Sequence, residues 1–146
     1  MKVKKMKNAI TVEVALQLAH ALKQQLAQQL EIQNLDITPM HVRVIMTIHK
    51  RQHCTAQDIV NLFKRDKAQI NRLIKGLIDQ GLVKKTVNPN DKRSQLLTLS
   101  AQGKDVQKTL FECAGEIQEK VTFGVNTDDL DIFVKVAQQM TKNLTS

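Results

Sequence analysis

The sequence contains no tryptophan and no tyrosine, and its 146 residues include only two cysteines, two prolines and five glycines. Two cysteines cannot build the disulfide framework of a small secreted domain, so they favour a reducing cytosol. No uninterrupted apolar run follows the lysines near the N-terminus, because residues such as Glu13 and His20 break it. We therefore expect a cytoplasmic protein that has neither a signal peptide nor a membrane span.

Catalytic and metal-binding patterns are missing as well. The sequence holds no HExxH, no CxxC and no Ser/His/Asp arrangement. His49, His53 and Cys54 fall at the end of one predicted helix and are zinc-binding residue types, but His41 lies about 80° away from His49 around that helix. We predict no enzyme, no catalytic residue, no cofactor and no metal ion, and expect capped or solvent-facing histidines.

The two thiols differ in their sequence surroundings. Cys113 falls on an apolar stripe and is predicted to be a core residue. Cys54 follows Lys50 and Arg51 and has histidines nearby, and neighbouring cations lower the pKa of a thiol. Cys54 is therefore predicted to be the more reactive of the two.

Positive charge is concentrated in one quarter of the chain. The formal charge of the whole sequence is +8. Residues 61–95 contain nine Lys or Arg against three Asp, whereas residues 100–146 contain five Lys against seven Asp or Glu. The first segment suits an extended polyanion. A run of like charge is more often only a solvent-exposed face. The elements on either side must therefore show whether this segment binds a polyanion.

Residues 66–80 have the pattern of a complete amphipathic helix. Asp66 is a good N-cap, and Gln69 stands where the second partner of a capping box would be. Gly81 can take the left-handed conformation that ends a helix. The apolar face is formed by Ile70, Leu73, Ile74, Leu77 and Ile78. The opposite face is basic and carries Arg65, Ala68, Arg72, Lys75 and Gly76, bordered by Gln69 and Asn71.

The segments on both sides of this helix complete a known unit. Residues 55–58 resemble another N-cap box and begin a short helix that ends just before Asp66, which is the spacing of a helix-turn-helix. Residues 82–87 and 94–99 are β-branched enough to pair around the polar loop 88–93. A helix-turn-helix followed by a hairpin is a winged helix. The predicted fold class is therefore mainly α with a small β-hairpin wing.

The stretch DKAQINRLIKGLIDQGLV followed by NPNDKRSQLLTLSAQG resembles the DNA-binding half of the multiple-antibiotic-resistance regulator (MarR) family of bacterial transcription factors. The most specific part is the wing, Asp91-x-Arg93-Ser94 followed by Leu97-x-Leu99-x-x-x-Gly103. The resemblance implies that Arg93 reaches into the minor groove and that Asp91 helps to hold the wing. It covers roughly residues 38–103. The chain departs from the family at Phe63-Lys64, where many members have a small residue or glycine.

Helices are predicted on both sides of the winged unit. Residues 10–32 are rich in Ala, Leu and Gln and free of Gly and Pro. Thr38-Pro39 gives an N-cap followed by proline at the first helical position, and residues 51–54 end that helix as a short extended piece beside the hairpin. Beyond the wing, Ser100 is predicted to cap a long helix. A last helix starts at residues 127–129.

The outer helices carry more apolar surface than one chain can cover, which favours a helical homodimer. We expect a single domain over residues 1–146, with residues 38–99 as the winged helix-turn-helix core and residues 10–32 and 103–145 as dimerisation helices. The basic segment 1–8 could contact DNA, but we expect a frayed, solvated end.

These elements predict a dimeric, sequence-specific regulator of transcription. A two-fold dimer presents two recognition helices about one duplex turn apart, so the expected target is double-stranded DNA with an inverted repeat whose half-site centres lie about 10 bp, or a small multiple of it, apart. Helix 66–80 is assigned to the major groove and loop 88–93 to the minor groove. The predicted DNA-contacting residues are Arg65, Lys67, Ala68, Gln69, Asn71, Arg72, Lys75, Asp91, Lys92, Arg93 and Ser94.

The roles of these residues divide by chemistry. Gln69 suits bidentate reading of adenine, and Arg65 or Arg72 could read guanine or bind a phosphate. The residues better placed for the DNA backbone, which sets register without specifying sequence, are Lys67, Asn71 and Lys75.

The resemblance also implies how such a protein acts. Repression is the more common outcome in the family, and small, often phenolic anions bind between the dimer helices and the winged domain. We expect such a pocket to be bordered by residues 10–32, the helix after Thr38 and the helix after Ser100. The alternatives are a nonspecific architectural DNA-binding protein, a redox- or metal-responsive regulator, and a protein-binding winged helix, in which Arg93 would have no evident task.

Overall fold

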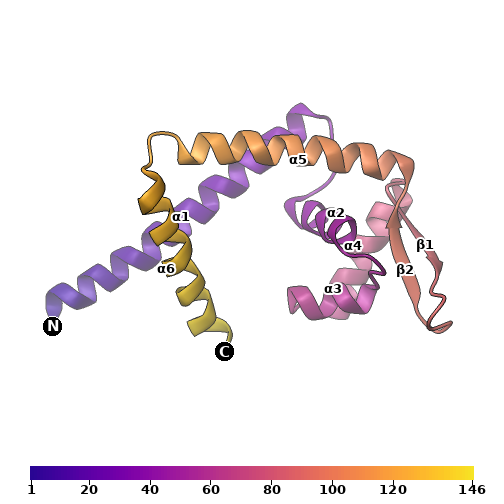
Figure 1. The fold of residues 1–146 in the computed structure, drawn as a ribbon, viewed down its shortest axis with the longest axis horizontal. Helices are drawn as coiled ribbons and strands as arrows, with labels where there is room; N and C mark the ends of the chain where they lie inside the picture. The colour runs from indigo at the N-terminus through magenta and orange to yellow at the C-terminus, as the bar shows by residue number, and fades with distance from the viewer. The chain divides into compact units, whose positions relative to one another are not determined.

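The computed structural model describes residues 1–146, except for the side chains of residues 7 and 8. Its elements, labelled in Figure 1, are α1 (Lys2–Ile32), α2 (Pro39–Lys50), α3 (Ala56–Phe63), α4 (Lys67–Asp79), β1 (Val83–Val87), β2 (Gln95–Leu99), α5 (Ala101–Thr122) and α6 (Thr127–Thr145). The chain forms two compact units, Met1–Ala114 and Gly115–Ser146. The predicted winged helix lies within the first.

Local capping explains where α2 and α3 begin. The Thr38 hydroxyl accepts a hydrogen bond from the His41 N–H at 3.4 Å, and the Thr38 N–H donates to Nδ1 of His41 at 3.0 Å, with Pro39 at the first helical position. Thr55 and Asp58 form the same reciprocal pair at the start of α3, at 3.1 and 2.9 Å. Each box satisfies donors that a helix leaves free at its first turn. Both predicted N-caps are therefore confirmed.

The start of α4 differs from the prediction. Asp66 occupies the N-cap position, but its side chain makes no capping hydrogen bond. The predicted capping box with Gln69 is therefore wrong. The Gln69 side chain lines an open hollow on the outer face of α4 instead of reaching back along the helix. The other end of α4 agrees with the prediction, because Gly81 has φ +75° and its N–H donates to the Ile78 carbonyl at 2.9 Å.

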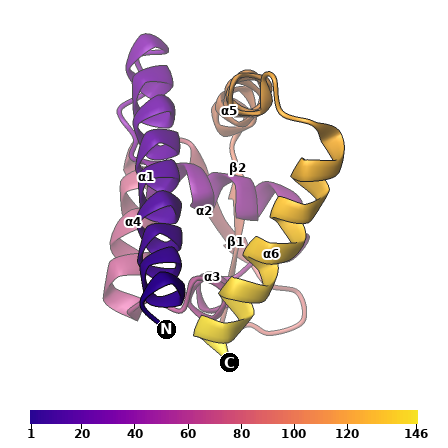
Figure 2. The same ribbon diagram turned by 90° about the vertical axis from the view of Figure 1, so that its left-hand side faces the viewer.

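The wing is an antiparallel hairpin in which the pairing runs from Val83 opposite Leu99 to Val87 opposite Gln95. Each strand begins one residue later than predicted. Residues 52–53, predicted to be extended, form a turn in which His53 has φ 59°. The chain after this turn joins the hairpin through a bridge between Thr55 and Leu96, and the Leu97 N–H donates to the Cys54 carbonyl at 2.7 Å. Helices α2, α3 and α4 lie on the same side of the hairpin (Figures 1 and 2).

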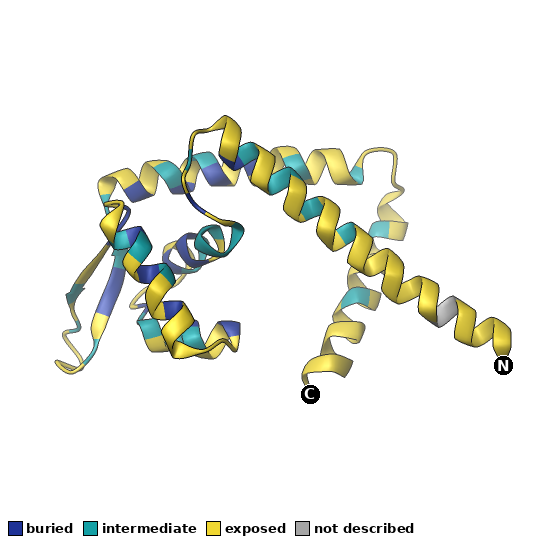
Figure 3. Ribbon diagram, turned by 180° about the vertical axis from the view of Figure 1, so that it is seen from behind, coloured by how far each residue is buried: buried dark blue, intermediate teal, exposed yellow. Residues whose placement is uncertain are grey.

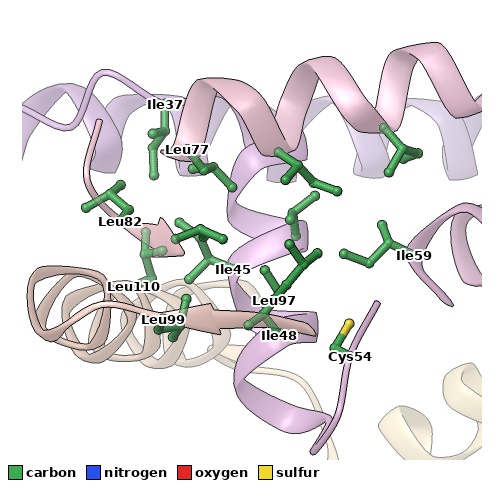
Figure 4. Close-up of a cluster of buried hydrophobic side chains, with 14 of the residues drawn as sticks. Ile37, Ile45, Ile48, Cys54, Ile59, Leu77, Leu82, Leu97, Leu99 and Leu110 are labelled. Atoms are coloured by element: carbon green, nitrogen blue, oxygen red, sulfur yellow. The ribbon is translucent and has the colours of Figure 1, made fainter. Parts of the chain in front are cut away.

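A single apolar cluster holds the winged helix together (Figure 4). Its fully buried members include Ile45 of α2, Ile59 of α3 and Leu77 of α4, and the hairpin contributes Leu97 and Leu99. Burying one such side chain stabilises a fold by about 1.5–3 kcal/mol. The position and tilt of α4 are thus fixed by its packed face, which leaves the opposite face available.

Most residues of α1 and α6 are exposed (Figure 3), and several of them are large and apolar. Helix α1 begins at Lys2, so the predicted frayed end is wrong, because a segment without Gly or Pro continues the helix despite its lysines. No described residue of α6 is buried. Although α1 runs for 31 residues, neither it nor another helix among the described residues is long and apolar enough to cross a membrane. The exposed large apolar residues of these two helices include Val3, Met6, Ile10, Val14, Leu16, Ile132, Phe133, Val136 and Leu144.

Candidate nucleic-acid interface

One face of α4 is packed against the core and the other is open. Ile70, Ile74 and Leu77 are buried. The side chains assigned to DNA contact in and before this helix are all exposed, namely Arg65, Lys67, Ala68, Gln69, Asn71, Arg72 and Lys75. Each of them is therefore accessible to a partner. The sequence placed Gly76 on the open basic face, but the structure shows it half-buried. A Cβ added to it would lie 3.3 Å from Nε2 of His41.

A shallow hollow of about 310 Å³ lies where α2 meets the open face of α4. Arg65, Gln69 and Arg72 line it together with Met40 and His41. A group that enters this hollow meets two guanidinium groups and one carboxamide, which are donors and acceptors suited to base edges. Sequence reasoning missed the two α2 residues, although the spacing of Thr38 and His41 could have indicated a capping box.

His41 takes part in this surface as a neutral ring. Burial lowers its pKa below the ordinary value of 6.5, and the negative charge of Asp36 opposes that shift. Its Nδ1 accepts the Thr38 N–H, so in the neutral ring Nε2 carries the hydrogen. Nε2 is also the atom that approaches Gly76 of α4. His41 thus approaches α4 and offers a hydrogen-bond donor to this surface, and it carries no charge at neutral pH.

Hydrogen bonds between neighbouring residues hold the wing loop. Asn88 donates from Nδ2 to the Ser94 hydroxyl at 3.0 Å, and its Oδ1 accepts the Asn90 N–H at 3.0 Å. Oδ1 of Asp91 accepts the N–H of Arg93 at 3.0 Å, and the Asp91 carbonyl accepts the Ser94 N–H at 3.2 Å. These bonds fix the backbone on both sides of Arg93. The residues with structural partners are therefore Asn88, Asp91 and Ser94.

The cations of the wing project into solvent. Lys92 and Arg93 are exposed, and neither side chain has a partner among the described residues. Lys84 and Lys85 on β1 are also exposed. These two lysines were not among the predicted contacts, although they belong to the basic segment 61–95 that the sequence singled out. The hairpin thus presents unpaired positive charge on a rigid frame, as binding to a phosphate backbone requires.

The turn between α3 and α4 accommodates its unusual residues. Phe63 is buried in the core, and the guanidinium of Arg43 lies 4.0 Å from the centre of its ring. Lys64 takes a left-handed conformation with φ 50° and stays exposed. A non-glycine residue adopts this conformation at a cost of roughly 1–2 kcal/mol. Packing of Phe63 offsets that cost and holds the two helices of the motif together.

The prediction of a reactive Cys54 is wrong. The residue is 1% exposed, and burial raises the pKa of its thiol, with Asp58 adding to the rise and Arg51 opposing it. The sequence neighbours of Cys54 were misleading because the side chain turns into the core. Cys113 is also buried, as predicted. Among the residues that the structure describes, no three His, Cys, Asp or Glu side chains gather as ligands of a metal ion.

We expect Cys54 of the native protein to react with iodoacetamide at pH 8 on the order of 100-fold more slowly than in the urea-unfolded chain. Because its pKa is raised in the fold, its contribution to stability is full below the ordinary value of 9.0 and is lost as the pH rises above it. Mass spectrometry of the peptide that contains Cys54 measures the rate. Equally fast labelling in both states would restore the reactive-thiol hypothesis.

Comparison with known proteins agrees with this geometry. The sequence model of the MarR family matches residues 35–94. The multiple antibiotic resistance protein MarR of Escherichia coli (strain K12) is 25% identical over 97 residues, which are 66% of this chain and 67% of that protein. Two further curated transcriptional regulators match over 62 and 72 residues, so the chain spans less than half of their length, 42% and 43%.

Two solved structures share the fold. The S. aureus MepR–DNA complex aligns with a TM-score of 0.81 at 18% identity, over 90% of this chain and 96% of that chain. BpsR of Bordetella bronchiseptica, whose DNA binding is regulated by 6-hydroxynicotinic acid, aligns with a TM-score of 0.70 at 22% identity, over 88% and 92%. Identities this low show the fold alone, and they confirm the predicted fold class. Together with the matches in sequence, they show that the winged helix of this chain is similar to the MarR family of transcriptional regulators.

Proposed function

We propose that this protein is a homodimeric, sequence-specific repressor that binds an inverted repeat in bacterial DNA and acts in the cytoplasm. Members of the family are transcription regulators and not enzymes. The observation that carries the proposal is the pairing of an open basic face on α4 with a hydrogen-bonded wing whose Arg93 has no protein partner. The first surface suits a major groove, and the second suits the adjoining minor groove.

Dimerisation follows from the apolar side chains left exposed on α1 and α6. So many exposed apolar side chains on each of two helices are unusual on a monomer and favour an interface. Closed two-fold symmetry is the commonest way for a chain to cover it. Two recognition helices related by such an axis read half-sites about 10 bp, or a small multiple of that spacing, apart. We assign residues 10–32 and 103–145 as the dimerisation helices, whose exposed apolar side chains form the contact.

The proposed division of labour uses the hollow beside α4. Because Arg65, Gln69 and Arg72 share it, one base edge entering from the groove is within reach of all three. Gln69 reads adenine, and the two arginines read guanine or hold a phosphate. The residues that set the register on the DNA backbone are Lys67, Ala68, Asn71, Lys75, Lys92 and Ser94. Arg93 enters the minor groove, and Asp91 holds the wing.

A small molecule relieves the repression in this proposal. The DNA binding of BpsR is regulated by 6-hydroxynicotinic acid, which is the kind of anion expected here. A ligand can act in this way only if it binds the DNA-competent and the DNA-incompetent arrangements with unequal affinity.

Selection of binding sites from a randomised duplex pool at about 150 mM salt tests the proposal, followed by anisotropy measurements over a salt series. We expect an enriched inverted repeat that is bound on the order of 10³-fold more tightly than random DNA. If a dimer neutralises roughly eight phosphates, the logarithm of affinity falls against that of salt with a slope of about −7. A steep slope without any enriched sequence would instead support the architectural alternative.

Gln69→Ala is expected to change which sequences are selected. Loss of the bidentate carboxamide costs about 1–3 kcal/mol of discrimination at one base pair of each half-site and leaves binding to random DNA nearly unchanged. Repeating the selection with the variant measures this effect. Asn71→Ala is the comparison on the same helix, because a backbone contact weakens all sequences alike. Equal, sequence-independent losses from both variants would contradict base reading by Gln69.

A further inference from the structure

The hairpin has a second face that the core does not use. Side chains alternate between the two faces of a strand, and Leu97 and Leu99 belong to the core cluster. The cross-strand pairs on the opposite face are Lys84 with Thr98 and Thr86 with Leu96. These side chains, together with parts of Leu97 and Leu99, line an open groove of about 790 Å³, here called the wing groove, which the end of α2 and the start of α5 complete. None of the DNA contacts predicted from the sequence lines it, and Lys84 is the one cation that it shares with the exposed wing surface described above.

Every ionisable side chain that lines the wing groove is basic. Arg51, Lys84 and Lys104 carry permanent positive charge, and His49 and His53 add two imidazoles. All five are exposed, and no Asp or Glu is among the described lining residues. Like charges around one groove repel each other, and an anion bound among them relieves that repulsion. The charge therefore favours a negatively charged occupant.

Two polar groups in the same groove have no partner. The side chain of Gln107 is 8% exposed, and its carboxamide makes no hydrogen bond to any described residue. The Thr98 hydroxyl oxygen is buried and also unpaired. Rotation about the Cα–Cβ bond of Thr98 would move the hydroxyl to another staggered position. Buried polar groups are almost always hydrogen-bonded, so the unpaired Thr98 hydroxyl indicates a missing polar partner, and the carboxamide of Gln107, which is not fully buried, is open to the same partner.

The rest of the lining is apolar. Ile48, Leu96 and Leu99 lie along the groove, and each is at most 7% exposed. A phosphate of the DNA backbone is polar on all sides and would leave this surface unused. An occupant with an apolar body, an anionic group and a further hydrogen-bonding group would use all three parts of the lining.

We propose that the wing groove binds a small amphipathic organic anion, with its acidic group at Arg51, Lys84 and Lys104 and a second polar group at Gln107 and Thr98. The groove shares β1 and β2 with the wing, so occupancy biases the position of the loop that carries Arg93. This regulatory consequence rests on the proposed DNA-binding function, whereas the binding site itself does not. The site involves no residue of α1 and so differs from the pocket expected from the sequence.

The probe for this site is 6-hydroxy-2-naphthoate, which combines a carboxylate, an apolar bicyclic body and a hydroxyl. Calorimetry on the full-length, DNA-free protein measures its dissociation constant. We expect binding in the micromolar to low millimolar range. The neutral analogue 6-hydroxy-2-naphthamide should bind at least tenfold more weakly, because it lacks the charge. Absence of probe binding, or equal binding of the two compounds, would overturn the proposal.

Three variants place the probe within the groove. Lys104→Gln, Gln107→Leu and Thr98→Val are each expected to weaken binding about threefold to tenfold. Thr98→Val keeps the shape of the side chain and removes an unpaired hydroxyl, so its thermal stability should equal or exceed that of the parent protein. Lys108→Gln is the matched control, because Lys108 is an exposed cation on α5 outside the groove. Equal affinity in all four variants would locate the probe elsewhere and overturn the assignment.

Anisotropy of a labelled duplex separates this proposal from the proposed function. If the probe binds the groove and the protein binds no selected DNA, the site stands and the regulator fails. If the protein binds DNA but no probe, the regulator stands and the site fails. If Lys104→Gln weakens DNA binding while the parent protein ignores the probe, the basic rim belongs to the DNA surface. If the parent protein binds both the probe and the selected DNA, saturating probe should change its affinity for that DNA at least threefold. An unchanged affinity would contradict the proposed effect of the groove on DNA binding.

Discussion

Gly103→Ala is expected to destabilise the protein by about 3 kcal/mol. A Cβ at this position would lie 2.0 Å from the carbonyl oxygen of Leu82 and 2.9 Å from its carbonyl carbon. Both atoms belong to the backbone, so no side-chain rotation relieves the clash. The same carbonyl accepts the N–H of Ser100 at 3.0 Å, which ties it in place. Chemical unfolding at a fixed protomer concentration measures the loss.

Gly115→Ala is the matched control in the same helix. A Cβ added to Gly115 meets nothing within 4 Å, and alanine favours a helix over glycine by about 1 kcal/mol. The control is therefore expected to be neutral or stabilising. If Gly103→Ala were as stable as the control, α5 would have room to move away from Leu82. The hairpin and α5 would then be less tightly joined than this structure shows.

The sequence predicted those features whose causes are local. The caps at Thr38, Thr55 and Ser100 each involve a partner three residues away, such as the Gly103 N–H that donates to the Ser100 hydroxyl at 2.9 Å. The loop bonds around Asp91 span two or three residues. Patterns of this length are complete within a short window, so helix starts and the wing could be identified without a structure.

Apart from the local capping box predicted for Asp66 and Gln69, the missed features of the site involve partners that are distant in sequence. Cys54 was judged from Lys50 and Arg51, whereas its burial follows from pairing with β2, whose Leu97 N–H donates to the Cys54 carbonyl. The contact of His41 with Gly76 joins α2 to α4. Periodicity alone gives the faces of a helix but not the neighbour that covers each face.

The wing groove could not be predicted for a related reason. Its lining comes from four separate segments, represented by Arg51, Lys84, Thr98 and Gln107. In sequence, Gln107 is an ordinary polar residue of a helix, and Thr98 is an ordinary residue of a strand. Only the packing shows that the Thr98 hydroxyl is buried without a partner and that Gln107 is 8% exposed beside the groove. An unsatisfied buried group is a property of the fold and not of a local pattern.

Arg93→Ala is expected to weaken DNA binding about 100-fold at 150 mM salt. A charge-assisted hydrogen bond contributes about 1.5 kcal/mol or more, and a dimer loses two of them, which corresponds to about two powers of ten. Because Arg93 contacts the minor groove in this proposal, selected and random sequences should lose affinity alike. The salt dependence should also become shallower by about 2. Anisotropy of a labelled duplex over a salt series measures all three effects, with Lys108→Ala as the control for net charge.

Asp91→Ala separates the geometry of the wing from its charge. The substitution makes the chain more positive, so electrostatic attraction alone predicts tighter binding to DNA. The structure predicts the opposite, because Oδ1 of Asp91 holds the N–H of Arg93 at 3.0 Å and its loss frees the loop that presents the guanidinium. We expect binding to weaken about tenfold, since ordering the loop then costs conformational entropy on association. Tighter binding by Asp91→Ala would show that Arg93 acts only as a point charge, and that the wing needs no fixed shape.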